Sequence, residues 1–533
     1  MTDNEFKEHL WRAANALRGS VTAAEYKHPV LALVFLKYVS DMFGAQAKVI
    51  EKRLSDPEHI MYVEDKELLK ELAASYAEDR DSYEQDNVFW IPQEARFSNL
   101  VTYSTADDLA QRLDKAMKSI EDENPNLNGV LYRDFGRLEL PAGKLGELMV
   151  ILARLKFDPE QHNSRDVFGE VYEYFLGKFA ASEGQRAGEF YTTKSVVTLL
   201  VEILAPYKGK VYDPACGSGG MFVQSLRFMR AHEKDFNEDG DLPIYGQEMM
   251  ATTRRLCQMN LAVHGLRGDL GKTYGNTFTN DQHPSLRADY ILANPPFNIS
   301  NWGGEQLADD PRWKWGVPPV NNANYAWLQH MLSRLAGDGR AGIVLANGSM
   351  TTNTSNEGVI RKAMVDDDLV ECMVALPGQL FTNTQIPVCL WFLSKDKTAG
   401  KKGNIDRRNE VLFIDCRDMG KEQVSRVQIA FTDDEIHEIA QTYHRWRGTA
   451  FADEKAYEDV KGFCQSATLE DIAKHDYALT PGRYVGAAEV EDDGEPFAEK
   501  MNDLTSLLAD QLNAGAVLEK ELKKKLMEVG YGL

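Results

Sequence analysis

The chain has 533 residues, of which 43% are hydrophobic and 27% are charged, and its formal net charge is −22 at pH 7. This composition is typical of a soluble globular protein, and the length predicts about three domains. The acidic balance argues against a chain that binds nucleic acid by itself, because such proteins usually present a basic face. Nucleic acid remains a candidate ligand if a local basic groove or a partner chain contacts the phosphates.

The cysteines and the N-terminal residues narrow the class of protein further. The six cysteines are scattered and form no C-x-x-C pair, so we expect neither a metal site nor a disulfide framework. The first 20 residues lack the apolar core of a signal peptide. No run is expected to be long and apolar enough to span a membrane, since the best candidate, residues 29–39, is interrupted by Lys37. We therefore expect a cytoplasmic protein with reduced thiols and no membrane contact.

Residues 1–160 are predicted to form an N-terminal helical domain, because apolar residues recur there at helical spacing. Residues 56–86 are highly charged and are expected at the surface. The predicted helical segments are residues 5–17, 29–43, 145–157 and, just past the domain boundary, 166–181.

Residues 161–420 are predicted to form a second domain of the α/β class. From about Gly188, apolar strands alternate with helices, which predicts a parallel sheet covered on both faces. Ligands bind such sheets at the carboxyl ends of the strands. The expected strands are residues 210–215, 244–247, 289–293, 341–346, 369–375 and 388–393, with 411–416 as an addition. The expected helices between them include residues 220–232, 252–264 and 325–337.

Residues 421–533 are predicted to form a helical and polar C-terminal region. Residues 500–529 form one long predicted helix, with leucines at helical spacing and an interruption at Gly515. A single apolar stripe fits a helix packed on its own domain, and it fits equally an arm that packs against another chain.

The first candidate motif lies immediately before the α/β region. It consists of Gly188, Glu189, Phe190, Tyr191, Thr192, Thr193 and Lys194. Its two aromatic rings and two hydroxyl groups could wall a small-molecule pocket. Thr193 could also cap a helix over residues 194–204, and both roles can hold together.

The second motif follows a predicted strand and opens a helix. It consists of Asp213, Pro214, Ala215, Cys216, Gly217, Ser218, Gly219 and Gly220. Glycines allow close approach of a ligand to the backbone and positive φ angles. The motif is neither a P-loop, which needs Gly-Lys-Ser/Thr, nor a dinucleotide fingerprint, because Phe222 occupies the third glycine position. The acidic Asp213 disfavours phosphate and favours a cation, such as the ammonium group of a sulfonium-linked amino acid.

Two further polar residues are expected near the ends of the next strands. Glu248 could accept hydrogen bonds from both hydroxyls of a ribose, or it could stabilise a helix N-terminus as an acidic residue. Asn276, within residues 275–278, could bond to an adenine edge or could serve as a turn residue.

The last motif is Asn294-Pro295-Pro296-Phe297, directly after the predicted strand 289–293. The two prolines lack N–H donors and fix φ near −65°, so the strand must end in a stiff loop. The Asn294 side-chain oxygen and the Pro295 carbonyl could accept both hydrogens of an amino group, while Phe297 lies against a ring. The motif taken alone is equally consistent with a turn that happens to contain Pro-Pro.

Four signals follow one another along the chain, namely residues 188–194, residues 213–220, Glu248 and residues 294–297. In this order they resemble the motifs of amino-group DNA methyltransferases that use S-adenosylmethionine. More specifically, the chain resembles the modification (M) subunit of type I restriction–modification systems. Residues 11–15 (WRAAN), 17–19 (LRG) and 479–485 (LTPGRYV) also resemble that family, so the resemblance covers nearly the whole chain. It implies a Rossmann-like S-adenosylmethionine-dependent methyltransferase sheet, with an N-terminal helical domain and a C-terminal helical tail.

The resemblance also implies a role for each motif. Residues 294–297 would form the catalytic loop that receives a flipped adenine, because a stacked base cannot reach a methyl donor. Cys216 lies in the cofactor motif, which argues against a C5-cytosine nucleophile. Residues that would hold S-adenosylmethionine are Glu189, Phe190, Tyr191, Thr192, Thr193, Lys194, Asp213, Gly217, Ser218, Gly219, Gly220, Glu248 and Asn276.

The implied partners are double-stranded DNA, a specificity (S) subunit that reads the sequence, a second M subunit and a restriction and motor (R) subunit. Residues 421–533 would contact the S subunit, and sequence reading by another chain would account for the acidic charge. The loop alone does not separate N6 of adenine from N4 of cytosine or from a protein glutamine. Enzymes of the last kind look smaller and commonly carry Tyr at the position of Phe297. A non-catalytic scaffold is disfavoured by the intact Asp213, Glu248 and Asn294.

Overall fold

The structure is a computed structural model of the chain. It describes residues 11, 23–86, 88–137, 143–154, 174–175, 177–178, 192–232, 242–381, 386–400, 402–425, 428–487 and 497–528. The chain divides into two compact units, Met1–Gly486 and Ala487–Leu533, and each is described by itself.

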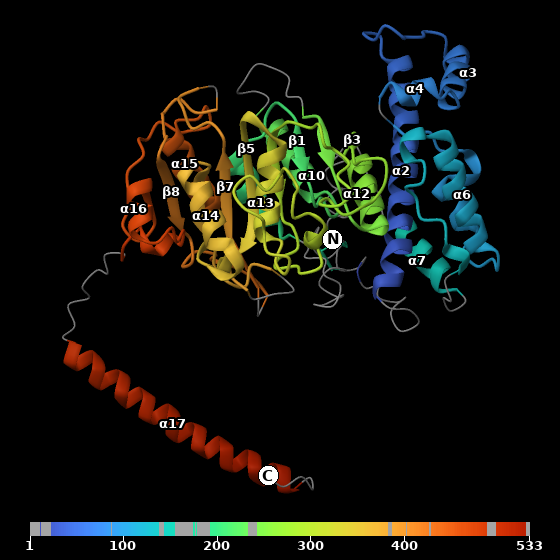
Figure 1. Cartoon of the computed structure of the whole chain (residues 1–533). Coiled ribbons are helices and arrows are strands. Elements are labelled where there is room, and N and C mark those ends of the chain that lie inside the picture. The colour runs from blue at the N-terminus through green and yellow to red at the C-terminus, as the bar shows by residue number, and fades with distance from the viewer. Residues whose placement is uncertain are drawn as a thin grey trace. The chain divides into compact units, whose positions relative to one another are not determined.

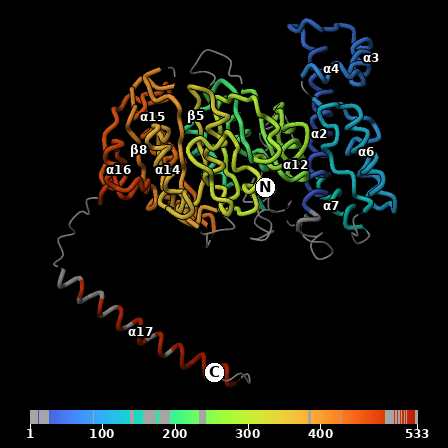
Figure 2. The backbone as a smooth tube through the Cα atoms, in the orientation of Figure 1, coloured from blue at the N-terminus to red at the C-terminus, as the bar shows by residue number. Residues whose placement is uncertain are grey.

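Helix α2 (Ala23–Ser55) is the centre of the N-terminal helical part (Figures 1 and 2). Its residues from Val30 to Leu36 are almost completely buried by the shorter helices around it. Helix α6 (Leu109–Glu123) presents Leu113, Met117 and Ile120 to this core at helical spacing. The other helices are α3 (Lys66–Ala77), α4 (Asp81–Glu84), α5 (Phe97–Leu100) and α7 (Lys144–Ala153).

Two of the predicted N-terminal helices can be compared with the structure. The segments 29–43 and 145–157 are confirmed as α2 and α7, although α2 is much longer than expected. The segments 5–17 and 166–181 lie almost entirely outside the described residues.

The apolar character of α2 corrects one expectation. Among the described residues, its stretch Lys27–Ser55 is long and apolar enough, by length and composition, to cross a membrane. Most of that stretch is buried by the helices packed on it. Lys37 lies inside this stretch, and its buried ammonium group pairs with the Asp41 carboxylate one turn further along. The apolar residues of α2 therefore form the core of the helical part.

Within the described residues, the α/β part is built on a nine-stranded sheet of order β11-β8-β6-β7-β5-β4-β1-β2-β3. All seven strands expected from the sequence are present. The strands are β1 (Val211–Asp213), β2 (Ile244–Gly246), β3 (Gly268–Asp269), β4 (Ala288–Ala293), β5 (Leu335–Ala346), β6 (Val370–Ala375), β7 (Val388–Ser394), β8 (Glu410–Asp415) and β11 (Cys464–Thr468). A separate ribbon pairs β9 (Glu422–Ser425) with β10 (Gln428–Ala430).

Helices cover both faces of the sheet, so both faces are buried. Successive side chains of a strand point to opposite faces, and adjacent residues therefore enter different cores. Ile291 and Ile343 face one core, whereas the adjacent Leu292 and Val344 face the other. The first core is closed by α13 (Asn324–Arg334), α14 (Glu357–Asp366) and α16 (Leu469–Lys474) (Figure 1). The second is closed by α9 (Lys194–Leu204), α10 (Gly220–Ala231), α12 (Ala251–Val263) and α15 (Asp433–Arg447).

The sheet is mixed, which corrects the expectation of a parallel sheet. Strand β7 lies between β5 and β6 and runs antiparallel to both, and β11 runs antiparallel to β8. The segment that joins β6 to β7 carries no helix in its described residues. Parallel neighbours need a crossover connection, usually a helix, so without one β7 returns in the opposite direction.

The sheet also continues beyond residue 420, where the sequence predicts a change to a helical region. Helix α15 packs against α9 and is fastened to β6 by a buried carboxylate. The Nε of Arg447 lies 3.0 Å from Glu371 Oε1, and the hydroxyl of Tyr443 donates to Glu371 Oε2 at 2.9 Å. Residues up to Gly486 therefore share the compact unit of the sheet. Strand β11 escapes sequence analysis because it is short and half polar.

The second unit contains α17 (Phe497–Glu528), which confirms the predicted long helix. Its exposed apolar side chains recur along the helix and include Leu508, Leu512, Leu518 and Leu522.

Replacement of Ile439 tests whether α15 is an integral part of the α/β core. Ile439 is fully buried, so Ile439→Ala is expected to lower the free energy of unfolding by about 2–5 kcal/mol. The control is Leu508→Ala on α17, whose side chain is exposed and whose loss should change stability little. Denaturant unfolding followed by tryptophan fluorescence measures both variants, and equally small effects would show that α15 does not stabilise the sheet.

Candidate active site

Three of the motifs converge because three parallel strands end at one edge of the sheet. Strand β1 lies between β2 and β4, with Tyr212 opposite Tyr245 on one side and Ile291 on the other. The chain that follows each strand emerges at the same edge. The loop after β1, Glu248 after β2 and Asn294 after β4 are thereby brought together.

Asp213, the last residue of β1, carries a carboxyl group that is only 2% exposed. Its Oδ1 accepts a hydrogen bond from the N–H of Ala215 at 2.9 Å. Burial raises the pKa of Asp213 to about 8 despite this bond, and the Glu248 carboxylate adds to the shift. Asp213 is therefore mostly protonated at neutral pH, and a cation beside it would restore the carboxylate.

The glycine loop (residues 213–220) is shaped for close approach of a ligand. Gly217 and Gly219 have φ angles of 53° and 84°, which side-chain-bearing residues rarely adopt. A Cβ atom on Gly219 would lie 2.9 Å from the Sγ of Cys257, so that position also lacks space. A Cβ atom on Gly217 or Gly220 would meet nothing within 4 Å. The loop thus exposes backbone to open space at these two positions.

Glu248 ties the second strand end to the glycine loop. Its Oε2 accepts from the N–H of Gly217 at 3.0 Å, and its Oε1 accepts from the N–H of Met250 at 2.9 Å. The second contact is to Met250, the residue before α12, and Glu248 is not in the first turn of that helix.

Asn276 is committed to its own loop. Its Nδ2 donates to the carbonyl of Trp302 at 3.1 Å, and its Oδ1 accepts from the N–H of Phe278 at 2.8 Å. The second bond is the local contact of an Asx turn, so the turn role is present. Residues 275–278 are expected at the end of the strand after β2, but they do not directly follow β3. The N–H of Gly275 donates to the Glu248 carbonyl at 3.0 Å and places this loop. The contact of Asn276 with an adenine edge stays a prediction.

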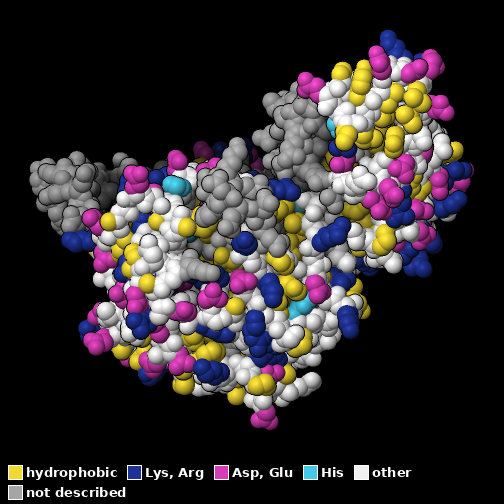
Figure 3. Space-filling model, turned by 90° about the horizontal axis from the view of Figure 1, so that it is seen from above, with side chains coloured by type: hydrophobic (Ala, Val, Ile, Leu, Met, Phe, Trp, Pro, Cys, Tyr) yellow, Lys and Arg dark blue, Asp and Glu magenta, His cyan; other side chains and the backbone are white. Residues whose placement is uncertain are grey.

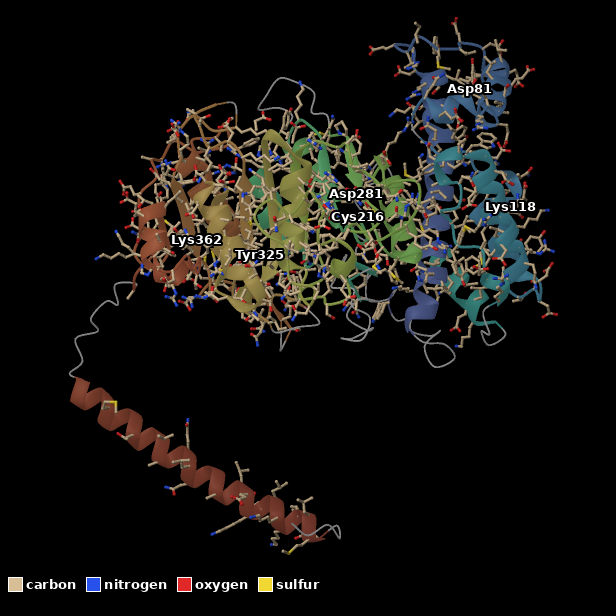
Figure 4. All side chains as sticks on the ribbon, viewed as in Figure 1. Asp81, Lys118, Cys216, Asp281, Tyr325 and Lys362 are labelled. Atoms are coloured by element: carbon tan, nitrogen blue, oxygen red, sulfur yellow. The ribbon has the colours of Figure 1, made fainter. Side chains whose placement is uncertain are left out.

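Two residues that the sequence does not single out hold this loop in place. The buried Gln247 donates through Nε2 to the carbonyls of Gly275 at 3.1 Å and Asn280 at 2.8 Å. Arg312 donates through Nη2 to the carbonyl of Phe278 at 2.6 Å. Gln247 could have been found from the sequence, because it is a polar residue directly before Glu248 at the end of a predicted strand. No local pattern marks Arg312. Figure 4 labels Cys216 of the glycine loop and Asp281, which lies just after the loop that contains Asn276.

The loop at residues 294–297 leaves β4 as the sequence predicts. The Nδ2 of Asn294 donates to the Oγ1 of Thr192 at 2.7 Å. The Oδ1 of Asn294 is buried and has no hydrogen-bond partner among the described residues. Leaving such an acceptor unpaired costs about 1–3 kcal/mol, so an N–H donor on a ligand would be bound favourably. Phe297 stands edge-on to Phe381, with ring centroids 6.4 Å apart.

Three amide side chains hold the chain where it leaves this loop. Asn298 has a φ of 53°, a left-handed conformation that asparagine tolerates. Its N–H donates to Asn324 Oδ1 at 3.1 Å. Its Oδ1 accepts from the Nδ2 atoms of Asn324 at 2.8 Å and Asn322 at 3.3 Å. The backbone after Phe297 is therefore fixed by contacts that do not involve Asn294.

The remaining predicted positions have different outcomes. Glu189, Phe190 and Tyr191 lie outside the described residues. Thr193 directly precedes α9, but among the described residues its buried hydroxyl makes no hydrogen bond, so the capping bond is not made. Lys194 is exposed in the first turn of α9.

Two more positions predicted from the sequence, Ser218 and Cys216, lie within the glycine loop. Ser218 uses its carbonyl to accept from Asn260 Nδ2 at 2.8 Å. The hydrogen bond to Cys257 and burial raise the pKa of Cys216 well above its ordinary value. A raised pKa favours the neutral thiol of Cys216 over the thiolate, which is the nucleophilic form.

The arrangement suits a ligand with a cationic group, a diol and a neighbouring amino group. Asp213 can face the cation, and Glu248 can accept from the hydroxyls. Gly217 and Gly220 leave space for the ligand, while the unpaired Oδ1 of Asn294 can accept from the amino group.

Comparison with known families agrees with this chemistry. The family model described as N-6 DNA Methylase matches residues 163–493, more than half of the chain, and the HsdM N-terminal domain matches residues 6–150. The fold and site thus define an N-6 DNA methylase that carries a helical N-terminal domain.

The relatives are more specific. The methylase subunit of the type I restriction enzyme HindI from Haemophilus influenzae is 49% identical over 430 residues, which cover 79% of this chain and 93% of that protein. The MjaIX methylase subunit from Methanocaldococcus jannaschii is 37% identical over 534 residues, covering 99% and 92%. The crystal structure of the type I restriction–modification methyltransferase subunit from Streptococcus thermophilus matches with a TM-score of 0.71 at 26% identity, covering 91% and 100%.

The chain belongs to the family of type I restriction enzyme methylase subunits and is an adenine-specific DNA methyltransferase. The predicted fold class, an α/β methyltransferase sheet with a helical N-terminus, is confirmed.

The raised pKa of Asp213 gives a pH dependence of stability. Its ordinary value is 3.8 and its value in the folded protein is about 8, so between these values the folded state binds more protons than the unfolded state. The free energy of unfolding should therefore fall as pH rises, by at most about 1.4 kcal/mol per pH unit from this group. Denaturant unfolding at pH 6 and pH 8 should show a larger loss for the wild type than for Asp213→Asn, and equal losses would contradict the assigned pKa.

Proposed function

We propose that this chain is the modification subunit of a type I restriction–modification complex and methylates N6 of an adenine that is flipped out of duplex DNA, with S-adenosylmethionine as the methyl donor. The observation that carries the proposal is the buried Oδ1 of Asn294, which has no partner among the described residues. It lies at the carboxyl edge of the sheet, directly after β4, the strand next to β1 and Asp213. A base must leave the helical stack to bring its amino group there.

The catalytic loop acts on the target amine through hydrogen bonds. Asn294 Oδ1 accepts one amino hydrogen and the Pro295 carbonyl accepts the other. Two acceptors favour a pyramidal nitrogen, whose lone pair is then less delocalised into the purine ring and is available for attack. Phe297, half-buried against Phe381, presents its ring beside this position. The N–C bond forms as the S–C bond of the donor breaks, and the methylated, positively charged nitrogen then releases one proton to water. The attack itself needs no charged base.

S-adenosylmethionine, when bound, supplies an electrophilic methyl group. Asp213 would hold its ammonium group, and the backbone at Gly217 and Gly220 would approach it closely. Glu248 would accept hydrogen bonds from the ribose hydroxyls. The buried carboxyl of Asp213 and the open space at the two glycines support this fit.

We also propose that a separate specificity subunit reads the DNA sequence, and that a second copy of this chain and a motor–nuclease subunit complete a cytoplasmic complex. The net charge of −22 supports this division, because the chain attracts phosphates weakly. Figure 3 shows basic and acidic side chains interspersed on the face in view. Within residues 421–533, helix α17 is the proposed contact with the specificity subunit, and its exposed leucines support this assignment.

Asn294→Ala is expected to abolish methyl transfer, a loss of at least about 100-fold, because a hydrogen bond to the reacting group disappears. Cofactor binding should be retained, since Asn294 is not among the residues proposed to hold the cofactor. Transfer of a radioactive methyl group to plasmid DNA by the assembled complex measures the first effect, and equilibrium binding measures the second. The control is Asn128→Ala, at an exposed N-terminal position. Normal methylation by the Asn294 variant would refute the assignment.

The isolated chain is expected to bind DNA weakly and without sequence preference. Addition of the specificity subunit should produce tight binding that depends on sequence. Fluorescence anisotropy with target and scrambled duplexes, at salt concentrations from about 50 to 200 mM, separates the two states. Tight and sequence-specific binding by the chain alone would contradict the division of labour between subunits.

A further inference from the structure

We propose that Thr192 is a positioning residue, which holds the side-chain amide of Asn294 in the orientation that methyl transfer needs. The inference rests on the proposed function of Asn294 and adds a role that the sequence does not suggest. The family resemblance implies that Thr192 is one of the residues that hold the cofactor. The structure instead places its hydroxyl 2.7 Å from the Nδ2 of Asn294, across 102 positions of the chain.

Thr192 is attached to a rigid element. Only Thr193 separates it from the start of α9. Four apolar residues of α9 are completely buried, namely Val196, Leu199, Leu200 and Ile203. The helix packs against the sheet on one side and α15 on the other. The hydroxyl of Thr192 is therefore fixed relative to the end of β4.

The backbone of the catalytic loop does not depend on Thr192. Its exit is held by the amide contacts between Asn298 and Asn324, at 2.8 and 3.1 Å, and by the packing of Phe297 on Phe381. Loss of the Thr192 hydroxyl should leave the loop in place and should release only the carboxamide of Asn294.

The orientation of this carboxamide matters because its two ends are nearly equal in shape and opposite in chemistry. An amino group on the substrate donates hydrogen bonds, so only Oδ1 can bind it, and Nδ2 must point away. In that orientation Nδ2 needs an acceptor, and the Oγ1 of Thr192 is the acceptor that the structure provides. Without it, a half-buried N–H group is left unpaired and the amide is free to rotate away from the amine.

The test compares three substitutions in the complex with the specificity subunit. Thr192→Val keeps the shape and removes the acceptor, Thr192→Ser keeps the hydroxyl, and Thr198→Val makes the same change at a half-buried position on α9. The measurements are the single-turnover rate of methyl transfer with saturating DNA and cofactor, the Kd for S-adenosylmethionine, and the thermal unfolding midpoint.

Thr192→Val is expected to slow methyl transfer about tenfold or more, as loss of a buried hydrogen bond implies. Its Kd for the cofactor and its unfolding midpoint should stay close to the wild-type values. Thr192→Ser should restore most of the rate, and Thr198→Val should behave as wild type. If Thr192→Val does not fold, Thr192→Cys provides the same loss through its weak acceptor sulfur.

Two outcomes would overturn the proposal. A weakened Kd with an unchanged single-turnover rate would return Thr192 to the cofactor site, and equal losses for the Val and Ser variants would exclude a role for the hydroxyl. Either result leaves the function proposed for Asn294 untouched, because that function is tested separately by Asn294→Ala. An active Asn294→Ala enzyme would instead remove the basis of both proposals.

Discussion

The parallel pairing of β1 with both β2 and β4 is the constraint on which the rest of the site depends. It sets the ends of three strands at one edge, so that residues far apart in sequence share a small volume. Side chains alternate along a strand, so a slip of one residue in this register would turn Asp213 towards the opposite face. The hydrogen bonds from Gly217 to Glu248 and from Gly275 to the Glu248 carbonyl then join the loops beyond the strands. The sheet therefore determines where the site residues lie, and the loops then fix their contacts.

The polar groups at the site differ from a buried charge remote from it. The buried Glu371 carboxylate is contacted by both Tyr443 and Arg447. At the site, in contrast, Asn294 Oδ1 has no partner among the described residues, and Asp213 is buried with one backbone contact. Groups held in place before the ligand arrives need no rearrangement during reaction, and this preorganisation is a large part of catalysis.

What the sequence predicts well is local. The strands, the α/β helices and the end of β4 at Asn294 follow from apolar runs, helical spacing and two prolines, which act on neighbouring residues. The direction of β7 depends on its connection and its neighbours, and β11 has no strong pattern of its own. These are properties of the assembled sheet. The sequence therefore predicts the fold class and not the full topology.

The same division holds for the site. Asp213, Glu248 and the 294–297 loop stand out because their residue types fit a recognisable chemistry at recognisable places. Asn276 shows the limit, since one asparagine can serve a ligand or a turn, and only the contacts with Trp302 and Phe278 show that its amide is used internally. Arg312 and the pairing of Thr192 with Asn294 connect distant segments and leave no local pattern.

The protonated state of Asp213 has a consequence for the electrostatics of the pocket. An empty pocket contains a neutral carboxylic acid, and a pocket filled by an ammonium group contains a carboxylate and a cation. The Asp213 side chain and such an ammonium group together carry no net charge, because the proton leaves as the cation enters. Burial of an isolated carboxylate at this position, which would be costly in a medium of low polarity, is thereby reduced. Binding beside Asp213 thus exchanges a proton for an ammonium group.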